Sequence, residues 1–188
     1  MSPLTLHLMR HGAPQTPGLL LGHTDMPPDP AAMQLCIDRS RALTFDCLTS
    51  SGLARASTPA TLIAIDRQAA HRIDPRWREL NFGEWEGMDP TTLPAGDTAR
   101  FWSSPDDYPP PGGESWSGLC HRVSAALGDV GEPTLILTHA GPIRAALTAL
   151  CGLNYQQAWA IDLPYSAVLT LRFWPGDNPG AQITGLVT

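Results

Sequence analysis

The chain has 188 residues, a hydrophobic fraction of 43% and a formal net charge of −6 at pH 7. This length fits a single domain over residues 1–188, with a core that needs no disulfide or metal to hold it. The acidic balance argues against nucleic acids and anionic membranes as partners, because both attract basic proteins. It does not exclude an anionic small molecule, since a pocket can be positive on an acidic protein.

The four cysteines, Cys36, Cys47, Cys120 and Cys151, are widely scattered and form no CxxC pair. This spacing indicates neither a zinc site nor a disulfide framework, so free thiols are expected. The first residues carry no basic region followed by an apolar one, and no apolar run approaches the roughly 20 residues of a membrane helix. We therefore expect a cytoplasmic protein.

The first predicted element is a strand that begins at Leu4, where leucines alternate with polar residues. It runs directly into Arg10, His11 and Gly12. In an open α/β sheet, residues just past the carboxyl end of a strand lie where ligands bind. Arg10 and His11 would therefore place a positive charge and a nucleophilic nitrogen in one crevice, beside a tight turn that Gly12 allows. The tripeptide alone is a weak indication, because an ordinary histidine can also end a strand.

Up to residue 87, loops alternate with helices and short strands. Prolines and glycines mark residues 13–28 as a loop. The elements expected after it are a helix with Asp29 as N-cap that ends near Leu43, a strand over 45–49, a helix from Ser57 to Ile65 and a strand over 71–74. Residues 77–87 mix acids and aromatics with two glycines, so we expect an irregular loop there.

Prolines interrupt residues 88–113 and leave room for one short helix near 99–102, so this segment is predicted to be a lid or cap over a pocket. The later elements are a helix over 114–130, a strand over 134–138, a helix from Pro142 to Cys151, and a hairpin of strands over 168–174 and 182–187. The strand over 134–138 is apolar on both faces, as a central parallel strand should be. The alternation of strands and helices predicts an α/β fold with a mostly parallel sheet covered on both faces.

Two of the predicted strands end in histidines, His11 and His139. If these strands are parallel neighbours, both imidazoles lie at one edge of the sheet, toward which the helix starting at Pro142 directs its N-terminal dipole. Arg10 and Arg55 also follow strand ends on that side. Together they predict a pocket for a phosphoryl group, whose anionic oxygens suit guanidinium donors. Alternatively, His139 caps a helix and Arg55 is a solvated helix residue.

Five sequence motifs stand in the order of a known family. They are Arg10-His11-Gly12, Ser50-Ser51-x-x-x-Arg55-Ala56, Glu79-x-x-Phe82-Gly83-x-Trp85-Glu86-Gly87, Gly113-Glu114-Ser115 and His139-Ala140-Gly141. Over residues 4–150 this series resembles the histidine phosphatase superfamily, also called the phosphoglycerate mutase-like family. The length and the segment 79–87 look closest to the small α-ribazole phosphatase and broad-specificity phosphatase branch. The resemblance implies a three-layer α/β/α fold with a mostly parallel central sheet.

The resemblance also implies an activity: a metal-independent phosphomonoesterase with a phosphohistidine intermediate and no cofactor. His11 would attack phosphorus, and Glu79 would protonate the leaving oxygen and then take a proton from water. The implied contacts to the phosphoryl oxygens and the substrate come from Arg10, Arg55, His139 and Ala140.

Two other acids, Glu84 and Glu86, compete with Glu79 for the acid role. We prefer Glu79 because the family pattern places its acid three residues before the aromatic of an aromatic-glycine pair. Arg144 is interpreted as a packed or rim charge rather than a catalytic one.

The chain departs from the family pattern just after the first motif. Family members usually carry Glu-Thr or Glu-Ser there and an asparagine further along, whereas this chain has Ala13, Pro14 and Pro17. A phosphate contact is therefore lost, or it is replaced by Thr16 or by backbone N–H groups of residues 18–22.

The expected partner is a small phosphorylated metabolite, with α-ribazole 5′-phosphate as a candidate, and neither a nucleic acid nor a membrane. Two alternatives stay open. One is phosphoglycerate mutase-type phosphotransfer. The other, which the missing phosphate contacts favour, is a catalytically silent module that binds a phospho-ligand or a protein.

Overall fold

The structure is a computed structural model that describes residues 2–188. Its strands form one sheet in the order β3-β2-β4-β1-β5-β6. The strands are β1 (Leu4–Arg10), β2 (Cys47–Ser50), β3 (His71–Ile73), β4 (Thr134–Thr138), β5 (Val168–Trp174) and β6 (Gly180–Val187). Strands β3, β2, β4 and β1 are parallel, and β5 and β6 continue the sheet in antiparallel fashion. The predicted mostly parallel sheet is confirmed.

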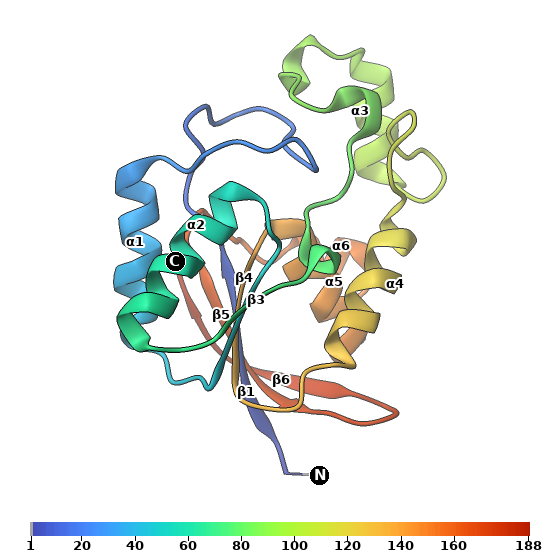
Figure 1. The fold of residues 1–188 in the computed structure, drawn as a ribbon. Coiled ribbons are helices and arrows are strands. Elements are labelled where there is room, and N and C mark those ends of the chain that lie inside the picture. Colours follow the sequence, from blue (N-terminus) through green and yellow to red (C-terminus); the bar gives the residue numbers. More distant parts are fainter. Residues whose placement is uncertain (1) are drawn as a thin grey trace.

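Helices cover both faces of this sheet. They are α1 (Pro30–Ser40), α2 (Ala54–Arg67), α3 (Ala95–Ser103), α4 (Trp116–Leu127), α5 (Ala140–Cys151) and α6 (Tyr155–Trp159), with 3₁₀ turns η1 (Pro75–Trp77), η2 (Gly83–Trp85) and η3 (Pro90–Thr92). Figure 1 shows α1 and α2 on one face and α4 and α5 on the other. The three-layer α/β/α prediction is therefore confirmed.

Each face of the sheet buries its own hydrophobic cluster. In β1, Leu6 and Leu8 pack with residues of α4 and α5, whereas Met9 packs with residues of α1 and α2. All of β4 is buried, as expected for a strand covered on both faces. Side-chain alternation fixes the register of β1 against β4, because a slip by one residue would exchange the two faces.

Helix α2 begins at Ala54, earlier than the predicted start at Ser57, and contains Pro59. The Ala54 N–H donates to the Asp25 carboxylate at 2.7 Å, so a residue of a distant loop caps the helix. Pro59 removes only the N–H that would bond to the Arg55 carbonyl. The predicted start was wrong because a proline usually marks a first turn, whereas this cap comes from a part of the chain that local spacing does not reveal.

Other helix boundaries also differ from the prediction. Helix α1 ends at Ser40 rather than near Leu43. Helix α5 begins at Ala140 rather than at Pro142, with His139 as its N-cap. Helix α6 was not predicted; it is a single short turn with a reciprocal capping box, too short to show a hydrophobic period.

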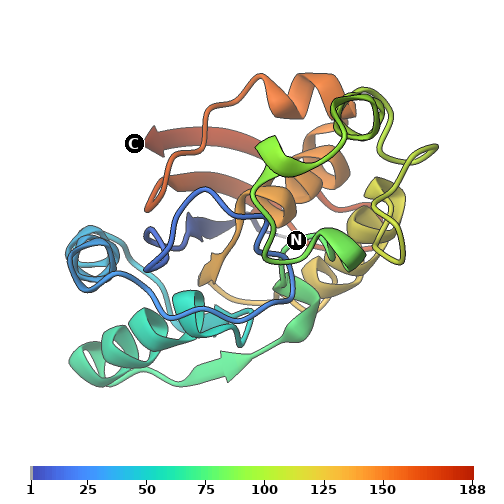
Figure 2. The same cartoon turned by 90° about the horizontal axis from the view of Figure 1, so that it is seen from above.

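The proline-rich segment 88–113 contains η3 and α3. Figure 1 shows α3 beyond the end of the sheet toward which β1 and β4 run. Figure 2 looks down on that end and shows the green segment that leads to α3 lying near the orange helices α5 and α6. Its action as a lid stays a prediction. Among residues 2–188, no helix is long and apolar enough to cross a membrane.

Candidate active site

The carboxyl ends of β1 and β4 lie side by side, because Arg10 pairs with Thr138 in the parallel ladder. His11 and His139 are the next residues of the two strands. Their ring centroids are 4.9 Å apart, with the planes inclined by 62°. The structure therefore brings the two predicted histidines together at one sheet edge.

His11 is buried, and its Nδ1 lies 2.6 Å from the Gly12 carbonyl oxygen. Since a carbonyl only accepts hydrogen bonds, Nδ1 carries the proton and Nε2 keeps its lone pair. Burial, and next the Arg55 guanidinium, hold the pKa of His11 well below its usual 6.5. The imidazole is therefore neutral at neutral pH, which is the state that a nucleophile needs.

His139 is fully buried, and its Nε2 lies 2.8 Å from the Ser51 hydroxyl oxygen. Its Nδ1 has no hydrogen-bond partner within residues 2–188. Burial, followed by the charge of Arg55, also lowers the pKa of His139 well below 6.5. A Ser51 hydroxyl that donates to Nε2 would leave Nδ1–H free to donate to a ligand.

Arg55 is also fully buried, and it holds the loop over the nucleophile. Its guanidinium donates to the carbonyls of Leu21, Gly22 and Thr24 at 2.7, 2.8 and 2.9 Å. Its Nε has no partner among the described residues. Arg55 thus fastens this loop to α2, and its Nε–H is still available to a ligand. It is therefore buried, and the alternative interpretation of Arg55 as a solvated helix residue is wrong.

Arg10 lies against Tyr165, a residue that the sequence did not single out. The guanidinium carbon is 4.0 Å from the Tyr165 ring centroid, and Nη1 donates to the Leu163 carbonyl at 2.6 Å. The same ring lies 5.6 Å from that of His11. Tyr165 follows α6 in an irregular loop, where no spacing or motif signals a role.

Glu79 reaches the same site from the irregular chain between η1 and η2. Its carboxylate accepts from the Gly141 N–H at 3.1 Å and from the Leu80 N–H at 2.9 Å. Gly141 lies in the first turn of α5, whose N-terminal dipole favours a negative group. A Cβ at Gly141 would collide with the Glu79 carboxylate, so the glycine makes room for the acid.

The two competing acids lie elsewhere. Glu84 is exposed. Glu86 accepts from the backbone N–H groups of Gly22, His23, Thr24 and Phe82. It therefore fastens the loop that Arg55 also holds, and of the three acids only Glu79 lines the cavity at His11.

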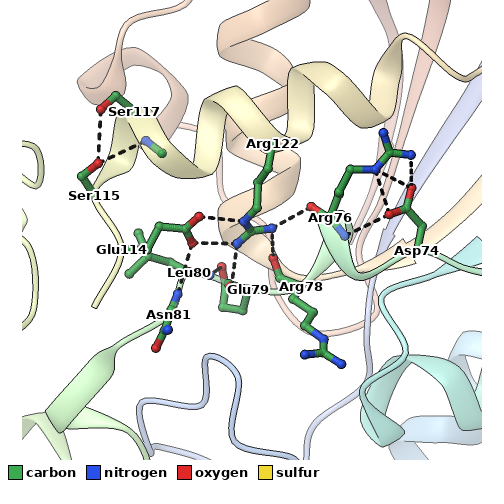
Figure 3. A network of polar contacts seen from close by, with 11 residues as sticks. Asp74, Arg76, Arg78, Glu79, Leu80, Asn81, Glu114, Ser115, Ser117 and Arg122 are labelled. Atoms are coloured by element: carbon green, nitrogen blue, oxygen red, sulfur yellow. Dashed lines mark hydrogen bonds and ion pairs between the residues drawn. The ribbon is translucent and has the colours of Figure 1, made fainter. Parts of the chain in front are cut away.

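Arg122 on α4 positions the segment that carries Glu79. Its guanidinium donates to the carbonyls of Arg76, Arg78 and Glu79 at 2.6 to 2.8 Å, and Glu114 holds it through a two-pronged ion pair at 2.7 and 2.8 Å. Figure 3 shows this guanidinium at the centre of the network. The sequence pointed to Glu114 within a motif but gave no signal for Arg122.

A cavity of about 140 Å³ opens at His11. It is lined by Arg10, His11, Pro14, Leu19, Leu20, Leu21, Glu79, Phe82 and Tyr165. Beside it, three donors have no partner within residues 2–188: Nε of Arg10, Nε of Arg55 and Nδ1 of His139. Unmet donors around one nucleophile suit a ligand with several anionic oxygens.

The sequence analysis also predicted groups that could replace the missing phosphate contact, and it placed Ala140 at the substrate. Thr16 is exposed, and the N–H groups of Leu20 and Gly22 are taken by the Met88 carbonyl and by Glu86. Thr16 is not among the residues that line the cavity at His11, and replacement of the phosphate contact by the N–H groups of residues 18, 19 and 21 stays a prediction. Ala140 begins α5 and lines a neighbouring cavity. Among residues 2–188, no group of three or more His, Cys, Asp or Glu side chains could hold a metal ion.

The fold and the site define a class of protein: a three-layer α/β enzyme that gathers two histidines and two arginines at the carboxyl ends of parallel strands. The chain matches the model of the histidine phosphatase superfamily (branch 1) over residues 6–182. It belongs to this superfamily, as the order of the motifs predicted.

Similar proteins carry two kinds of name. The adenosylcobalamin/alpha-ribazole phosphatase of Escherichia coli K12 is 27% identical over 169 residues, which cover 83% of each chain. The "probable phosphoglycerate mutase GpmB" of Salmonella choleraesuis is 30% identical over 84% of this chain and 78% of its own. The crystal structure of the alpha-ribazole phosphatase from Shigella flexneri matches with a TM-score of 0.82 at 22% identity, over 96% of this chain and 95% of that one. At that identity the structural match shows the shared fold.

Proposed function

We propose that this histidine phosphatase is a metal-independent phosphomonoesterase that forms a phosphohistidine at His11. One observation supports this most strongly. A neutral imidazole with a free Nε2 lines the same cavity as the Glu79 carboxylate. A nucleophile and an acid that face one ligand are what two-step phosphoryl transfer requires.

In the first step, Nε2 of His11 bonds to phosphorus while the bond from phosphorus to the leaving oxygen breaks. Glu79, in its acid form, gives its proton to that oxygen, and an alcohol departs. In the second step, water attacks the phosphohistidine and Glu79 takes the proton of that water. The phosphorus–nitrogen bond breaks, inorganic phosphate leaves and neutral His11 is restored.

Arg10, Arg55 and His139 would stabilise the charge that develops on the phosphoryl oxygens. Each has a buried donor that no described residue uses. In this proposal Ser51 fixes the tautomer of His139, so that Nδ1–H points its proton at the ligand. Two guanidinium groups then supply the positive charge that Mg²⁺ supplies in other phosphoryl-transfer enzymes.

For the natural substrate, we propose a small phosphorylated metabolite with α-ribazole 5′-phosphate as the first candidate. The similar phosphatase of Escherichia coli supports this choice by its name. A panel of phosphomonoesters that includes α-ribazole 5′-phosphate tests it, and a kcat/KM no higher than for simple alkyl phosphates would exclude that metabolite.

Phosphoglycerate mutase-type transfer is the second candidate, because another similar protein carries that name. In the cavity at His11, Arg10 is the only arginine or lysine among the lining residues, and phosphoryl oxygens would engage it. Arg144 lines the neighbouring cavity beside Glu79, but that cavity is mostly aromatic and suits the carboxylate of 3-phosphoglycerate poorly, so we prefer hydrolysis. Release of inorganic phosphate supports hydrolysis, and formation of 2-phosphoglycerate supports the mutase.

The decisive experiment compares wild type with His11→Ala on p-nitrophenyl phosphate in the presence of a metal chelator. We expect the variant to lose at least about 10³-fold in kcat and to lose an acid-labile phosphoryl label on the protein. His121→Ala is the matched control, because His121 is an exposed histidine of α4. Equal turnover by His11→Ala and wild type would refute the nucleophile, and inactivity of wild type would favour a silent binding module.

We also propose a cytoplasmic location. All four cysteines are free in the structure, which fits a reducing compartment. Fractionation of the source cells tests this, and recovery outside the cytoplasm would contradict it.

A further inference from the structure

A second cavity, which we name the aromatic pocket, lies beside the acid. Its volume is about 130 Å³. Its aromatic lining residues are Phe82, Phe101, Trp102, Trp116, Tyr155 and Trp159. Glu79 and Phe82 line both this pocket and the cavity at His11, so the two spaces are neighbours that meet at these residues.

The aromatic walls come from separate elements that meet around the pocket. Trp102 belongs to α3, whereas Tyr155 and Trp159 belong to α6. The Trp159 ring centroid lies 5.5 Å from that of Trp102 and 5.0 Å from that of Tyr155. Trp102 and Trp159 are 40% and 38% exposed, in contrast to the buried aromatics of the core. Two half-exposed indoles on a pocket rim offer a ligand apolar surface.

Two donors of the pocket residues have no partner within residues 2–188: Nε of Arg144 and the Tyr155 hydroxyl. The Arg144 guanidinium lies 4.2 Å from the Trp159 ring centroid and donates through Nη2 to the Ile161 carbonyl at 3.2 Å. Both the cation and the ring are thereby held in place. Buried donors normally have an acceptor. We therefore expect one of these two donors to bind a single polar atom of a ligand that otherwise occupies a largely apolar space.

We propose that the aromatic pocket binds the leaving-group half of the substrate, and that this half carries one flat aromatic ring with a hydrogen-bond acceptor at its edge. This inference rests on the proposed phosphatase chemistry at His11. Glu79 must reach the leaving oxygen, so the group beyond that oxygen continues past the carboxylate, where the pocket lies. Its volume is close to the roughly 150 Å³ of an engineered protein cavity that binds benzene.

Polar leaving groups fit this space poorly. A leaving group made only of a polyol or a short carboxylate would bring several polar atoms to two available donors and would leave the indole surfaces uncovered. An aromatic ring covers the indoles, and one acceptor at its edge meets Arg144 or Tyr155. The assignment therefore gives Arg144 a role in substrate binding in addition to its packing on Trp159.

The first test compares 2-phenylethyl phosphate with ethyl phosphate, because both release primary alcohols whose leaving oxygens have similar basicity. For Trp102→Ala and, separately, Trp159→Ala, we expect kcat/KM to fall by about 10-fold for the phenylethyl ester and to change less than about 2-fold for the ethyl ester. Tyr108→Ala is the matched control. Tyr108 is a half-exposed aromatic that lines a different hollow of the same segment, so neither rate should change.

The second test addresses the acceptor. Wild type should prefer 2-(4-pyridyl)ethyl phosphate to 2-phenylethyl phosphate, because the ring nitrogen accepts a hydrogen bond. Tyr155→Phe keeps the ring and removes the hydroxyl donor, so it should reduce this preference while the rate for the phenyl ester stays near that of wild type. An unchanged preference would remove Tyr155 from the assignment.

The outcomes separate the subsite from the phosphatase chemistry. If His11→Ala hydrolyses p-nitrophenyl phosphate as fast as wild type, the proposed chemistry fails. If turnover depends on His11 but both tryptophan variants affect the two alkyl esters equally, or affect neither, the aromatic pocket is not the leaving-group subsite. The subsite proposal also fails if the protein hydrolyses p-nitrophenyl phosphate through His11 but does not hydrolyse 2-phenylethyl phosphate.

Discussion

The nucleophile and the acid of the candidate site are held in place by different kinds of structure. His11 and His139 directly follow two paired parallel strands in the middle of the sheet. Glu79 lies on irregular chain, where Arg122, Glu114 and the Gly141 N–H hold it. Many backbone hydrogen bonds of the strand ladder position the two histidines, whereas only a few contacts position Glu79. Single substitutions should therefore displace the acid more easily than the nucleophile.

The largest expected effect is an exception to this comparison, because the nucleophile side also has one fragile support. Arg55→Lys replaces a planar fork with a point charge that cannot serve the carbonyls of Leu21, Gly22 and Thr24 together. We expect kcat/KM to fall by about 10³-fold and Tm to fall as well, measured with p-nitrophenyl phosphate and by thermal unfolding.

Arg67→Lys is the control for this variant, since Arg67 is an exposed arginine of the same helix. It should leave kcat/KM unchanged. Wild-type activity of Arg55→Lys would show that the strand ends alone form the anion site.

Gly141→Ala tests the acid side directly. The added Cβ would collide with the Glu79 carboxylate, whereas the helix itself should tolerate alanine. We expect kcat to fall by about 10²-fold for alkyl phosphates, which need protonation of the leaving group, and to fall less for p-nitrophenyl phosphate. Gly96→Ala in α3 is the matched control, because its Cβ would meet open space. Equal losses for both kinds of ester would argue against Glu79 as the acid.

The same contrast explains what the sequence could predict. Strand ends follow from the hydrophobic pattern, which is an alternation before His11 and a continuous apolar run before His139, so the two histidines could be placed together from the sequence. Nothing in spacing connects Arg122 on α4 with the segment that carries Glu79, or Tyr165 with Arg10, because these contacts join irregular chain to distant elements. The start of α2 was missed for the same reason, since its cap is Asp25. The preference for Glu79 rested on the family pattern, and the geometry now gives it a physical basis.

A smaller effect is expected from Arg122→Lys. A lysine keeps a charge near Glu114 but cannot donate to the carbonyls of Arg76, Arg78 and Glu79 at once. Glu79 should lose part of its alignment, so we expect kcat to fall by about 10-fold for alkyl phosphates and less for p-nitrophenyl phosphate. Arg76→Lys is the control, because the Arg76 side chain pairs with Asp74 and Asp129. A uniform loss for both kinds of ester would indicate a structural role only.

The smallest expected effect concerns the dependence of stability on pH, and it separates the two buried histidines from the loop over the site by their pH windows. Burial, and next Arg55, lower the pKa of both His11 and His139 well below 6.5, so below that pH the unfolded chain binds protons that the folded chain rejects. The free energy of unfolding should therefore fall as pH drops from about 7 toward 5, by at most about 1.4 kcal/mol per pH unit for each histidine.

Glu86, which fastens the loop over the site, behaves in the opposite sense and at lower pH. Burial raises its pKa, but backbone N–H groups of His23, Thr24 and Phe82 outweigh this and lower it below 4.5. Its stabilisation is present above 4.5 and is lost only as pH falls through the lowered value, so Glu86 contributes little to the window from 7 to 5. Burial also lowers the pKa of His7, His23 and His71, so these three histidines add to the slope that His11 and His139 produce there. Thermal unfolding across this window should show a shallower slope for His139→Gln than for wild type, with His121→Gln as the control. An unchanged slope in His139→Gln would mean that His139 accepts a proton in the folded chain as readily as in the unfolded chain, which would contradict the lowered pKa of His139.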